Sequence, residues 1–507
     1  MKIFTTQEIR EIDRYTIDND GVSSAELIER VAEGVACEIT SRWTPRKPTA
    51  IFAGPGNNGA DALAVARLLA EQGFRPEVFL FNIGGNKLSH DCATMRDLLR
   101  ETPGVDLIEV VSNFSLPDLT SSHLVIDGLF GSGLHRPLSG GFVSLVQYIN
   151  ESMATVVAID IPSGLYGEWN PEAINRNIIH ANLTLAVQAP KLSFFISDYA
   201  DIVGEWKVLD IELSTEKIRS VSPQYHLVEK ADVRRMLRRR PDICSKADFG
   251  SAIIYAGSYG MMGAAVLATK GALRSGVGKT TIYSPRCGFN ILQSTVPEAL
   301  FSEDRDDLVI SEISPSHRFN SIAIGPGIGT QDATVKALED FLAGTTVPVI
   351  LDADALNCIA ARPSILSTIP ILSILTPHAG EFDRLFGSQV SAEARLRKAI
   401  EVARYYNIFI ILKGHYTALV RPDGKVYFNS SGCSAMATPG CGDVLTGILA
   451  SVLAQGYSPE YAAIISVFVH GRAGEMAAEL HGQYGVTASD IADNVGRAIK
   501  EIMTKSK

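Results

Sequence analysis

Short apolar runs alternate with longer helical stretches along most of this chain. In the first half the apolar runs occupy residues 49–54, 76–82, 123–130, 155–164 and 183–190. Turn-forming residues bound the runs, and stretches with helical periodicity, such as residues 6–40 and 60–73, separate them. Strands that alternate with helices favour a mostly parallel sheet with helices on its faces. We therefore predict an α/β fold for this half.

The same alternation starts again after a polar segment, residues 214–247, which includes the arginine-rich run 233–241. The apolar runs of the second half occupy residues 251–257, 279–285, 321–327, 347–357, 371–382 and 409–420. Long helical stretches are expected at 260–275, 331–343, 391–406 and 443–455. We predict two α/β domains, 1–215 and 225–507. We interpret the arginine run as the solvated face of a linking helix rather than an anion-binding patch.

The composition excludes several classes of protein. The chain has 507 residues and a formal net charge of −10, which argues against a nucleic-acid partner. Its apolar runs are too short to span a bilayer and its N-terminus lacks a signal-like segment, so we expect no membrane partner. Seven cysteines without C-x-x-C spacing favour a reducing compartment. We therefore expect a cytoplasmic protein.

A glycine-rich turn, Gly54-Pro-Gly56-Asn-Asn-Gly59, joins the first predicted strand to a helix. This G-x-G-x-x-G spacing lets backbone amides and a helix N-terminus approach a phosphate. The next predicted strand, 76–82, ends without the acidic residue that nicotinamide dehydrogenases use to bind the ribose. The turn therefore favours a phosphate-bearing ligand but not a dehydrogenase.

Polar residues gather where the strands of the first half end. Asn57, Asn58 and Asp61 start the first helix after a strand, and Asp127 and Ser163 follow later strands. Their oxygens suit a hard cation, although helix capping and turn formation explain Asn and Asp equally well.

Two more segments of the first half follow predicted strands. The loop 127–137 is rich in glycine and carries polar side chains, and Asp160 closes an apolar strand before Pro-Ser-Gly. A carboxylate in that position is a candidate acid/base group. Turn initiation by Asp160 is an equally consistent interpretation.

The second half contains a stronger pattern, Gly440-Cys-Gly442-Asp443, which opens an apolar helix. Its glycines let backbone amides converge at the helix N-terminus, where phosphate charge is stabilised. Asp443 lies in the first turn of that helix and can act as a base in phosphoryl chemistry. The competing pattern, Gly276-Val-Gly278-Lys279-Thr280, is not a P-loop, because Leu273 replaces its first glycine and a strand follows its lysine.

Four predicted strands of the second half end in polar turns, at 325–329, 352–357, 377–381 and 413–417. Strand ends that share one edge of a sheet favour one shared cleft. Lys413 could meet nucleotide phosphates there, although a lone lysine after a strand is more commonly solvated.

Taken in order, these motifs resemble one known family. The whole chain resembles the bifunctional NAD(P)H-hydrate repair enzymes, an epimerase domain fused to an ADP- or ATP-dependent dehydratase. The matching segments of the first half are QEIREIDRYTI, GPGNNGADA, DGLFGSGLHRPLSG, IDIPSGL and QAPK. Those of the second half are KADFGSAIIYAGS, GMMGAAVLATKGALRSGVG, IGPGIG, LDADALN, LTPHAGEF, LKG and MATPGCGDVLTGILA. The resemblance implies a Rossmann-like three-layer N-terminal domain and a ribokinase-like C-terminal α/β domain.

The resemblance also implies roles in the first domain. The residues implied to bind the hydrated dinucleotide are Asn57, Asn58, Gly59, Ala60, Asp61, Gly131, Ser132, Gly133, Leu134, His135, Arg136, Pro137 and Asp160. Asn58, Asp127 and Ser163 would bind a potassium ion, and Asp160 would move a proton during epimerisation at C6. Ala60 and Ala62 stand where the family usually has glycine. Alanine at a positive φ costs about 1 kcal/mol or more, so either substitution would weaken the epimerase if its position needs that conformation.

In the second domain the resemblance places the hydrate on Gly329, His378 and Asp443. The residues implied to bind ADP or ATP are Lys413, Gly414, His415, Tyr416, Thr417, Gly440 and Gly442. Asp443 would aid phosphoryl transfer to the C6 hydroxyl, with Mg²⁺ accompanying the nucleotide, and we expect a homo-oligomer. The alternative function is a ribokinase-like small-molecule kinase with an accessory dinucleotide-binding domain.

Overall fold

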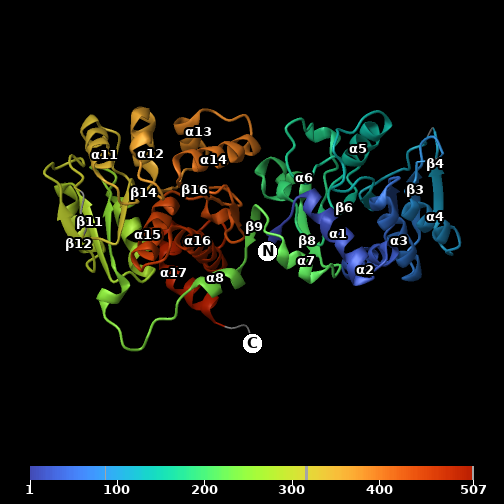
Figure 1. The fold of residues 1–507 in the computed structure, drawn as a ribbon, viewed down its shortest axis with the longest axis horizontal. Coiled ribbons are helices and arrows are strands. Elements are labelled where there is room, and N and C mark those ends of the chain that lie inside the picture. Colours follow the sequence, from blue (N-terminus) through green and yellow to red (C-terminus); the bar gives the residue numbers. More distant parts are fainter. Residues whose placement is uncertain (86, 113, 315–317, 505–507) are drawn as a thin grey trace. The chain divides into compact units, whose positions relative to one another are not determined.

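The computed structural model describes residues 1–85, 87–112, 114–314 and 318–504, which form two compact units (Figure 1). The N-terminal unit comprises residues 2–224, and the C-terminal unit comprises residue 1 together with residues 225–507. Each unit packs helices against its own β-sheet (Figure 1), so the predicted α/β class is confirmed.

The N-terminal unit is built on a parallel sheet with the strand order β4-β3-β2-β5-β6-β7-β8. Its strands are β2 (Thr49–Ala53), β3 (Pro76–Phe81), β4 (Asp106–Val110), β5 (Leu124–Gly128), β6 (Thr155–Ile159), β7 (Leu183–Val187) and β8 (Glu205–Leu209). Its main helices are α1 (Thr6–Asp20), α2 (Ser24–Arg42), α3 (Asn57–Glu71), α4 (His90–Arg100) and α5 (Gly141–Glu151).

Alternate residues of β2 point to opposite faces of this sheet. Ile51 and Ala53 belong to a core that includes side chains of α1, α2, α3 and α4. Ala50 and Phe52 belong to a second core that includes side chains of α5. Since strand side chains alternate with a period of two, one strand serves both layers of helices. The unit therefore has the predicted three layers.

The predicted helical stretch 6–40 is two helices. Gly21, with φ 73°, ends α1 in the left-handed conformation that glycine adopts at little cost. Ser23 then caps α2, because its hydroxyl accepts a hydrogen bond from the Glu26 amide while Glu26 accepts from the Ser23 amide.

The sheet of the C-terminal unit has the strand order β9-β18-β17-β16-β15-β14-β13-β10-β11-β12. Its strands are β9 (Tyr225–Val228), β10 (Ser251–Tyr255), β11 (Lys279–Ser284), β12 (Leu300–Glu303), β13 (Ser321–Ile324), β14 (Ile350–Leu351), β15 (Ile374–Leu375), β16 (Phe409–Leu412), β17 (Ala418–Val420) and β18 (Val426–Asn429). The strands between β12 and β16 in this order pair parallel, whereas β16, β17 and β18 pair antiparallel. The apolar run 409–420 is thus two strands joined by a turn. Lys279 opens β11, which agrees with the rejection of a P-loop.

Helices cover this second sheet as well. They are α8 (Lys230–Met236), α9 (Met262–Arg274), α10 (Phe289–Thr295), α11 (Asp332–Gly344), α12 (Ala353–Ala361), α13 (Ala379–Phe386), α14 (Ala392–Tyr406), α15 (Cys441–Ala454), α16 (Pro459–His481) and α17 (Ala488–Met503). One core joins the sheet to α9, α15, α16 and α17. On the other face, the Tyr255 ring lies 6.5 Å from the Phe341 ring of α11. In the described part of the chain, no helix is long and apolar enough to cross a membrane.

The expected linking helix is shorter than the arginine run. Helix α8 ends at Met236, and the arginines that follow pack on aromatic rings. The Arg238 guanidinium lies 4.4 Å from the Tyr457 ring centre, and that of Arg240 lies 3.8 Å from the Phe249 ring centre. Arg234 and Arg235 of α8 are exposed, as predicted, and cation–π contacts hold the arginines that follow the helix.

Helices α15 and α9 approach at Gly447, where a Cβ atom would lie 1.9 Å from the Ala268 carbonyl oxygen. We predict that Gly447→Ala destabilises the C-terminal unit by about 1–3 kcal/mol, because the helices must separate. Gly263→Ala is the control, since a Cβ atom there meets nothing within 4 Å and alanine favours the helix. Thermal unfolding of both variants measures the difference. Equal stability of the two would contradict the packing.

Candidate active sites

In the N-terminal unit, a cavity of about 610 Å³ opens at the carboxyl ends of β2, β5 and β6. Helix α1 forms part of its wall. The predicted residues that line it are Asn57, Asn58, Asp61, Gly131, Ser132, Gly133, Leu134, His135, Arg136 and Asp160. Gly59 and Ala60 are instead buried in the first turn of α3, and Pro137 lines a neighbouring cavity. The structure therefore gathers most of the predicted residues around one space.

The glycine turn allows a close backbone approach. A Cβ atom at Gly59 would lie 1.8 Å from the Gly54 carbonyl oxygen, so this position accepts only glycine without movement. Ala60 and Ala62 lie within α3 and neither has a positive φ. Gly128 faces Ala62, since a Cβ atom at Gly128 would lie 2.4 Å from Ala62 Cβ. The two alanines therefore carry no left-handed strain.

Asp160 sits at the end of β6 with a strained left-handed backbone, φ 66°. Its Oδ1 lies 2.6 Å from Lys191 Nζ, and its Oδ2 accepts a hydrogen bond of 3.0 Å from the Ser132 amide. Burial alone would raise the pKa of Asp160, but the Lys191 ammonium and the Ser132 bond lower it below its usual value. The carboxylate is thus ionised and able to accept a proton.

The pKa values of two further carboxyls in this cavity, Asp61 and Asp13, are raised instead of lowered. Burial raises the pKa of Asp61 well above its usual value, and the negative charge of Asp160 adds to that rise. Burial and the charge of Asp160 also raise the pKa of Asp13 to about 6, against the effect of Lys191. The site therefore holds two carboxyls with raised proton affinity beside one, Asp160, whose proton affinity is lowered.

Asp127 and Ser163 form a buried pair at the ends of β5 and β6. Asp127 Oδ1 accepts a hydrogen bond of 2.6 Å from the Ser163 hydroxyl, and its Oδ2 accepts one of 2.8 Å from the Ser163 amide. Burial raises the pKa of Asp127 to about 6 despite these bonds. The Asn58 Nδ2 atom is buried without a hydrogen-bond partner among the described residues. The Asp127 carboxylate and the Ser163 hydroxyl supply oxygens of the kind that suit a hard cation, whereas Asn58 Nδ2 is a hydrogen-bond donor.

The C-terminal unit has a second cavity, of about 830 Å³. The predicted residues that line it are His378, Lys413, Gly414, His415, Thr417, Gly440, Gly442 and Asp443. The Tyr416 ring packs edge-on to His415, with 4.5 Å between their ring centres. Gly329 lies in the turn after β13, and its amide donates to Asp354 at 2.9 Å. Three of the four predicted turns, at 352–357, 377–381 and 413–417, contribute to the cavity, whereas the turn 325–329, with Gly329, does not line it.

The N-terminus of α15 opens into this cavity. Gly440 has φ 84°, and a Cβ atom there would lie 2.4 Å from Leu267 Cδ1, so the position requires glycine. Asp443 lies in the first turn of α15. Burial, assisted by the charge of Asp352, raises the pKa of Asp443 to about 7 against the opposing effect of Lys413. A carboxyl with that pKa can exchange a proton near neutral pH.

Lys413 is held by carboxylates instead of being solvated. Its Nζ lies 2.9 Å from Asp352 Oδ1 and 3.7 Å from Glu381 Oε2. Thr376 and Thr446 each donate a hydrogen bond of 2.6 Å to Asp352. Burial alone would lower the pKa of Lys413, but these carboxylates outweigh burial and raise the pKa above its usual value. The cavity therefore contains a fixed positive charge close to Gly442.

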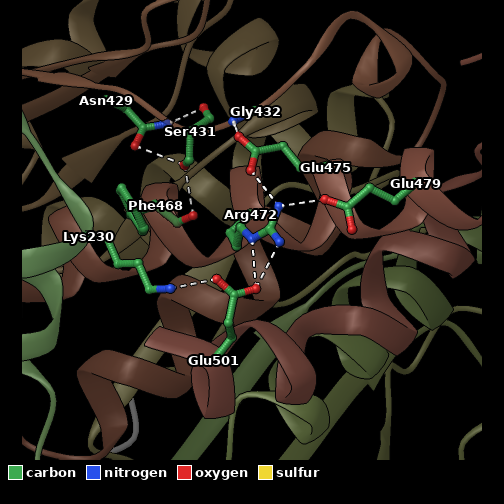
Figure 2. A network of polar contacts seen from close by, with 9 residues as sticks. All are labelled: Lys230, Asn429, Ser431, Gly432, Phe468, Arg472, Glu475, Glu479 and Glu501. Carbon is green, nitrogen blue, oxygen red and sulfur yellow. Dashed lines mark hydrogen bonds and ion pairs between the residues drawn. The ribbon is translucent and has the colours of Figure 1, made fainter. Parts of the chain in front are cut away.

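Figure 2 shows the polar network that holds the Gly432 loop, residues 429–437, on one side of the cavity. The Gly432 amide donates to Glu475 Oε1 at 2.7 Å, and Glu475 Oε2 lies 2.9 Å from Arg472 Nη1. Arg472 also binds Glu501, at 2.8 Å, and Glu501 binds Lys230 at 2.7 Å. The loop is therefore tied through α16 to α17 and α8.

Cys441 is not activated as a nucleophile. Its Sγ lies 3.3 Å from His470 Nε2. Burial raises the pKa of Cys441 to about 12 and lowers that of His470 to about 4. Both groups are therefore neutral near pH 7, and Asp443 is left as the reactive side chain at this turn.

Comparison with known proteins identifies the family. The sequence profile "YjeF-related protein N-terminus" matches residues 24–193, and the profile "NAD(P)H-hydrate dehydratase" matches residues 252–497. The bifunctional NAD(P)H-hydrate repair enzyme of Thermofilum pendens is 32% identical over 519 residues, which cover 99% of this chain and 97% of that protein. The chain belongs to the bifunctional NAD(P)H-hydrate repair enzyme family. The relative from Moorella thermoacetica is also 32% identical, over 97% of this chain and 96% of that protein.

Solved structures related to this repair enzyme match one half of it. The ADP/ATP-dependent NAD(P)H-hydrate dehydratase from Bacillus subtilis, co-crystallized with ATP/Mg²⁺, is 32% identical with a TM-score of 0.48. The matched region covers 55% of this chain and 98% of that protein.

Sequence reasoning gave no role to several groups that shape the two sites of this repair enzyme. Lys191 and Asp352 lay within the matched segments QAPK and LDADALN, yet their ion pairs join separate strand ends. Asp13 lay in the matched segment QEIREIDRYTI. Its spacing of four residues from Ile9 and Ile17 on the predicted helix was the only sequence feature that could have indicated its position. Glu475 lies within α16 and carries no local motif.

We predict that Glu475→Ala loosens the Gly432 loop, because a part-buried amide loses its acceptor. Such a loss costs about 1–3 kcal/mol, so we expect amide hydrogen exchange in the loop to accelerate about tenfold or more. Glu479→Ala is the matched control, because Glu479 binds Arg472 from an exposed position. If both variants exchange the loop amides equally fast, Glu475 does not hold the loop.

Proposed function

We propose that this chain repairs hydrated NADH and NADPH in two steps. The N-terminal unit would interconvert the R and S forms of the hydrate at C6, and the C-terminal unit would dehydrate the S form with ADP or ATP. The observation that carries the second step is Asp443, a carboxyl with a pKa of about 7 at a glycine-rich helix N-terminus in a large cavity. Family membership along nearly the whole chain supports both steps.

The dehydration chemistry follows from the poor leaving-group ability of hydroxide. Asp443 takes the proton of the C6 hydroxyl while that oxygen attacks the terminal phosphoryl group of the nucleotide. Backbone amides at Gly440 and Gly442 stabilise the charge that develops on the phosphoryl oxygens. Phosphate then leaves with the C6 oxygen, and loss of a proton from C5 restores the reduced ring. Phosphate is thus a transient leaving group in this scheme.

Lys413 would neutralise nucleotide phosphates in the same cavity. Its ammonium is held in place by Asp352, so it presents its charge with little motion. Mg²⁺ would bring further charge neutralisation to the phosphates, and Glu381, which lines the cavity, offers an oxygen ligand of the kind that this ion prefers.

For the epimerase step, Asp160 is the proposed base. Lys191 keeps its carboxylate ionised, and the carboxylate faces the cavity that contains the glycine turn. The turn and the loop 131–136 would hold the dinucleotide. We also propose that Asn58, Asp127 and Ser163 hold a potassium ion, whose charge would offset that of the buried Asp127 carboxylate. Among the described residues, no cluster of three or more His, Cys, Asp or Glu side chains could hold a metal ion, so amide and hydroxyl oxygens must contribute.

A ribokinase-like small-molecule kinase is the second candidate, because it would share Asp443 and its turn. The separate N-terminal cavity and the full-length relatives favour repair over that alternative. The seven free cysteines support a cytoplasmic location. A homo-oligomer stays a prediction of the resemblance.

Two amide substitutions separate the two activities. We predict that Asp443→Asn lowers nucleotide-dependent dehydration of the S form about a hundredfold or more and leaves epimer exchange intact, whereas Asp160→Asn does the reverse. Absorbance of the regenerated reduced cofactor measures dehydration, and chromatography of the R and S forms measures exchange. Each variant is therefore the control for the other.

The pH dependence provides a further check on Asp443. Since its pKa is about 7, the basic carboxylate is present above that pH and lost below it. Dehydration by the wild type should accordingly slow as the pH falls from about 8 to about 6. Asp443→Asn should retain no such limb, and near wild-type dehydration by that variant would exclude the assignment.

A further inference from the structure

Helix α1 presents one acidic residue to the N-terminal cavity. Ile9, Asp13 and Ile17 are spaced four residues apart and all line the cavity, which places them along one face of the helix. Ile12 and Thr16, which lie next to this face around the helix, are buried. Because that packing fixes the rotation of α1, the Asp13 carboxyl is directed to the cavity that contains Asp160.

The charged groups in this cavity are unequally compensated. The titratable side chains that line it are Arg10, Asp13, Asp61, His135, Arg136 and Asp160, with Lys191 bonded to Asp160. Arg10 lies 3.4 Å from the Gly133 carbonyl oxygen, to which it donates. Lys191 donates to the Ala189 carbonyl oxygen as well as pairing with Asp160. Asp160 is therefore paired with a buried cation, whereas neither Asp13 nor Asp61 forms an ion pair with any residue that the structure describes.

This unequal compensation separates the proton affinities of the carboxyls. Lys191 lowers the pKa of Asp160, while burial and the charge of Asp160 raise that of Asp13 to about 6. Pairs of titratable groups whose surroundings drive their pKa values apart are the usual arrangement of an acid and a base in one active site. One member of this pair is the residue already proposed to move a proton.

We propose that Asp13 is the second acid/base group of the epimerase, paired with Asp160. This inference rests on the proposed epimerase function and adds to it the group that supplies the proton. The two carboxyls come from different elements, α1 and the end of β6, so they can reach the C6 oxygen from different directions.

The proton transfers balance with water as the only other participant. Asp13 gives its proton to the C6 hydroxyl, the C6–O bond breaks with the electron pair leaving on oxygen, and the ring nitrogen donates its lone pair to C6. Water leaves, and a water molecule adds to the opposite face of C6 while Asp160 takes its proton. The cycle leaves Asp13 ionised and Asp160 protonated, and proton exchange with solvent restores both. The roles reverse for the other epimer.

Asp61 fits this role less well than Asp13. Its pKa is raised well above the usual value by burial and by three neighbouring carboxylates, Asp160, Asp13 and Asp91. The raised pKa favours the protonated form of Asp61, which can donate a hydrogen bond. A group with a pKa close to the working pH transfers protons most efficiently, which describes Asp13.

The test is the pH profile of epimer exchange in the full chain, with purified R or S hydrate of NADH as substrate and no nucleotide. We expect wild-type exchange to fall as the pH rises above about 6, where Asp13 loses its proton. Asp13→Asn should slow exchange about 10²-fold or more and abolish that limb of the profile. Asp18→Asn, an exposed change on the same helix, is the matched control and should leave both unchanged.

A second variant keeps the test informative if Asp13→Asn fails to fold. Asp13→Glu retains the carboxyl but displaces it by one methylene, so exchange should slow while a shifted limb remains. Exchange by Asp13→Asn at the wild-type rate with the limb preserved, or an unaltered rate and limb in Asp13→Glu, would overturn the proposal. Absence of exchange in the wild type would instead refute the epimerase function itself, so the two failures are distinguishable.

Discussion

Each site of this enzyme contains a buried carboxylate at the end of a parallel strand that is paired with a lysine, and its geometry depends on that pair. In the N-terminal unit Lys191 pairs with Asp160 at 2.6 Å, and in the C-terminal unit Lys413 pairs with Asp352 at 2.9 Å. Each lysine follows a neighbouring or nearby strand of the same sheet. Since a lone buried charge is strongly disfavoured, each pair fixes the geometry of the strand ends around its cavity.

The same pairing determines which carboxyls keep a proton. Each lysine lowers the pKa of its direct partner, Asp160 or Asp352. It lowers that of the second acid, Asp13 or Asp443, too little to offset burial. Burial, assisted by the charge of Asp160 or Asp352, raises the pKa of Asp13 to about 6 and that of Asp443 to about 7. Two unrelated motifs thus have the same electrostatic arrangement, a carboxyl with a raised pKa beside one whose pKa is lowered by a lysine. In the proposed chemistry the exchanging acids act on the C6 oxygen in both halves.

Much of the fold was predictable because the central strands are continuous apolar runs and the helices between them are long. The edge strands β4 and β8 were missed, since their residues alternate between exposed and buried and form no such run. The glycine turns were predictable because their glycine spacing before a helix is a local pattern. The structure adds the tertiary contacts, since a Cβ atom at Gly440 would meet Leu267 of α9. Lys191 and Lys413 could not be assigned their partners, because an ion pair between strand ends depends on the strand order. The raised pKa values of Asp443 and Asp13 could not be predicted either, because they depend on burial and on the neighbouring charges.

The central claim is that one chain converts both hydrate epimers to reduced cofactor. An equal mixture of R and S hydrates of NADH, incubated with the full chain and either ADP or ATP with Mg²⁺, measures it through the final absorbance of NADH and the free phosphate released. The account predicts complete conversion of the mixture, with one phosphate released for each NADH formed. Conversion that stops at half would contradict the epimerase assignment, and a phosphorylated product without NADH would contradict the dehydratase.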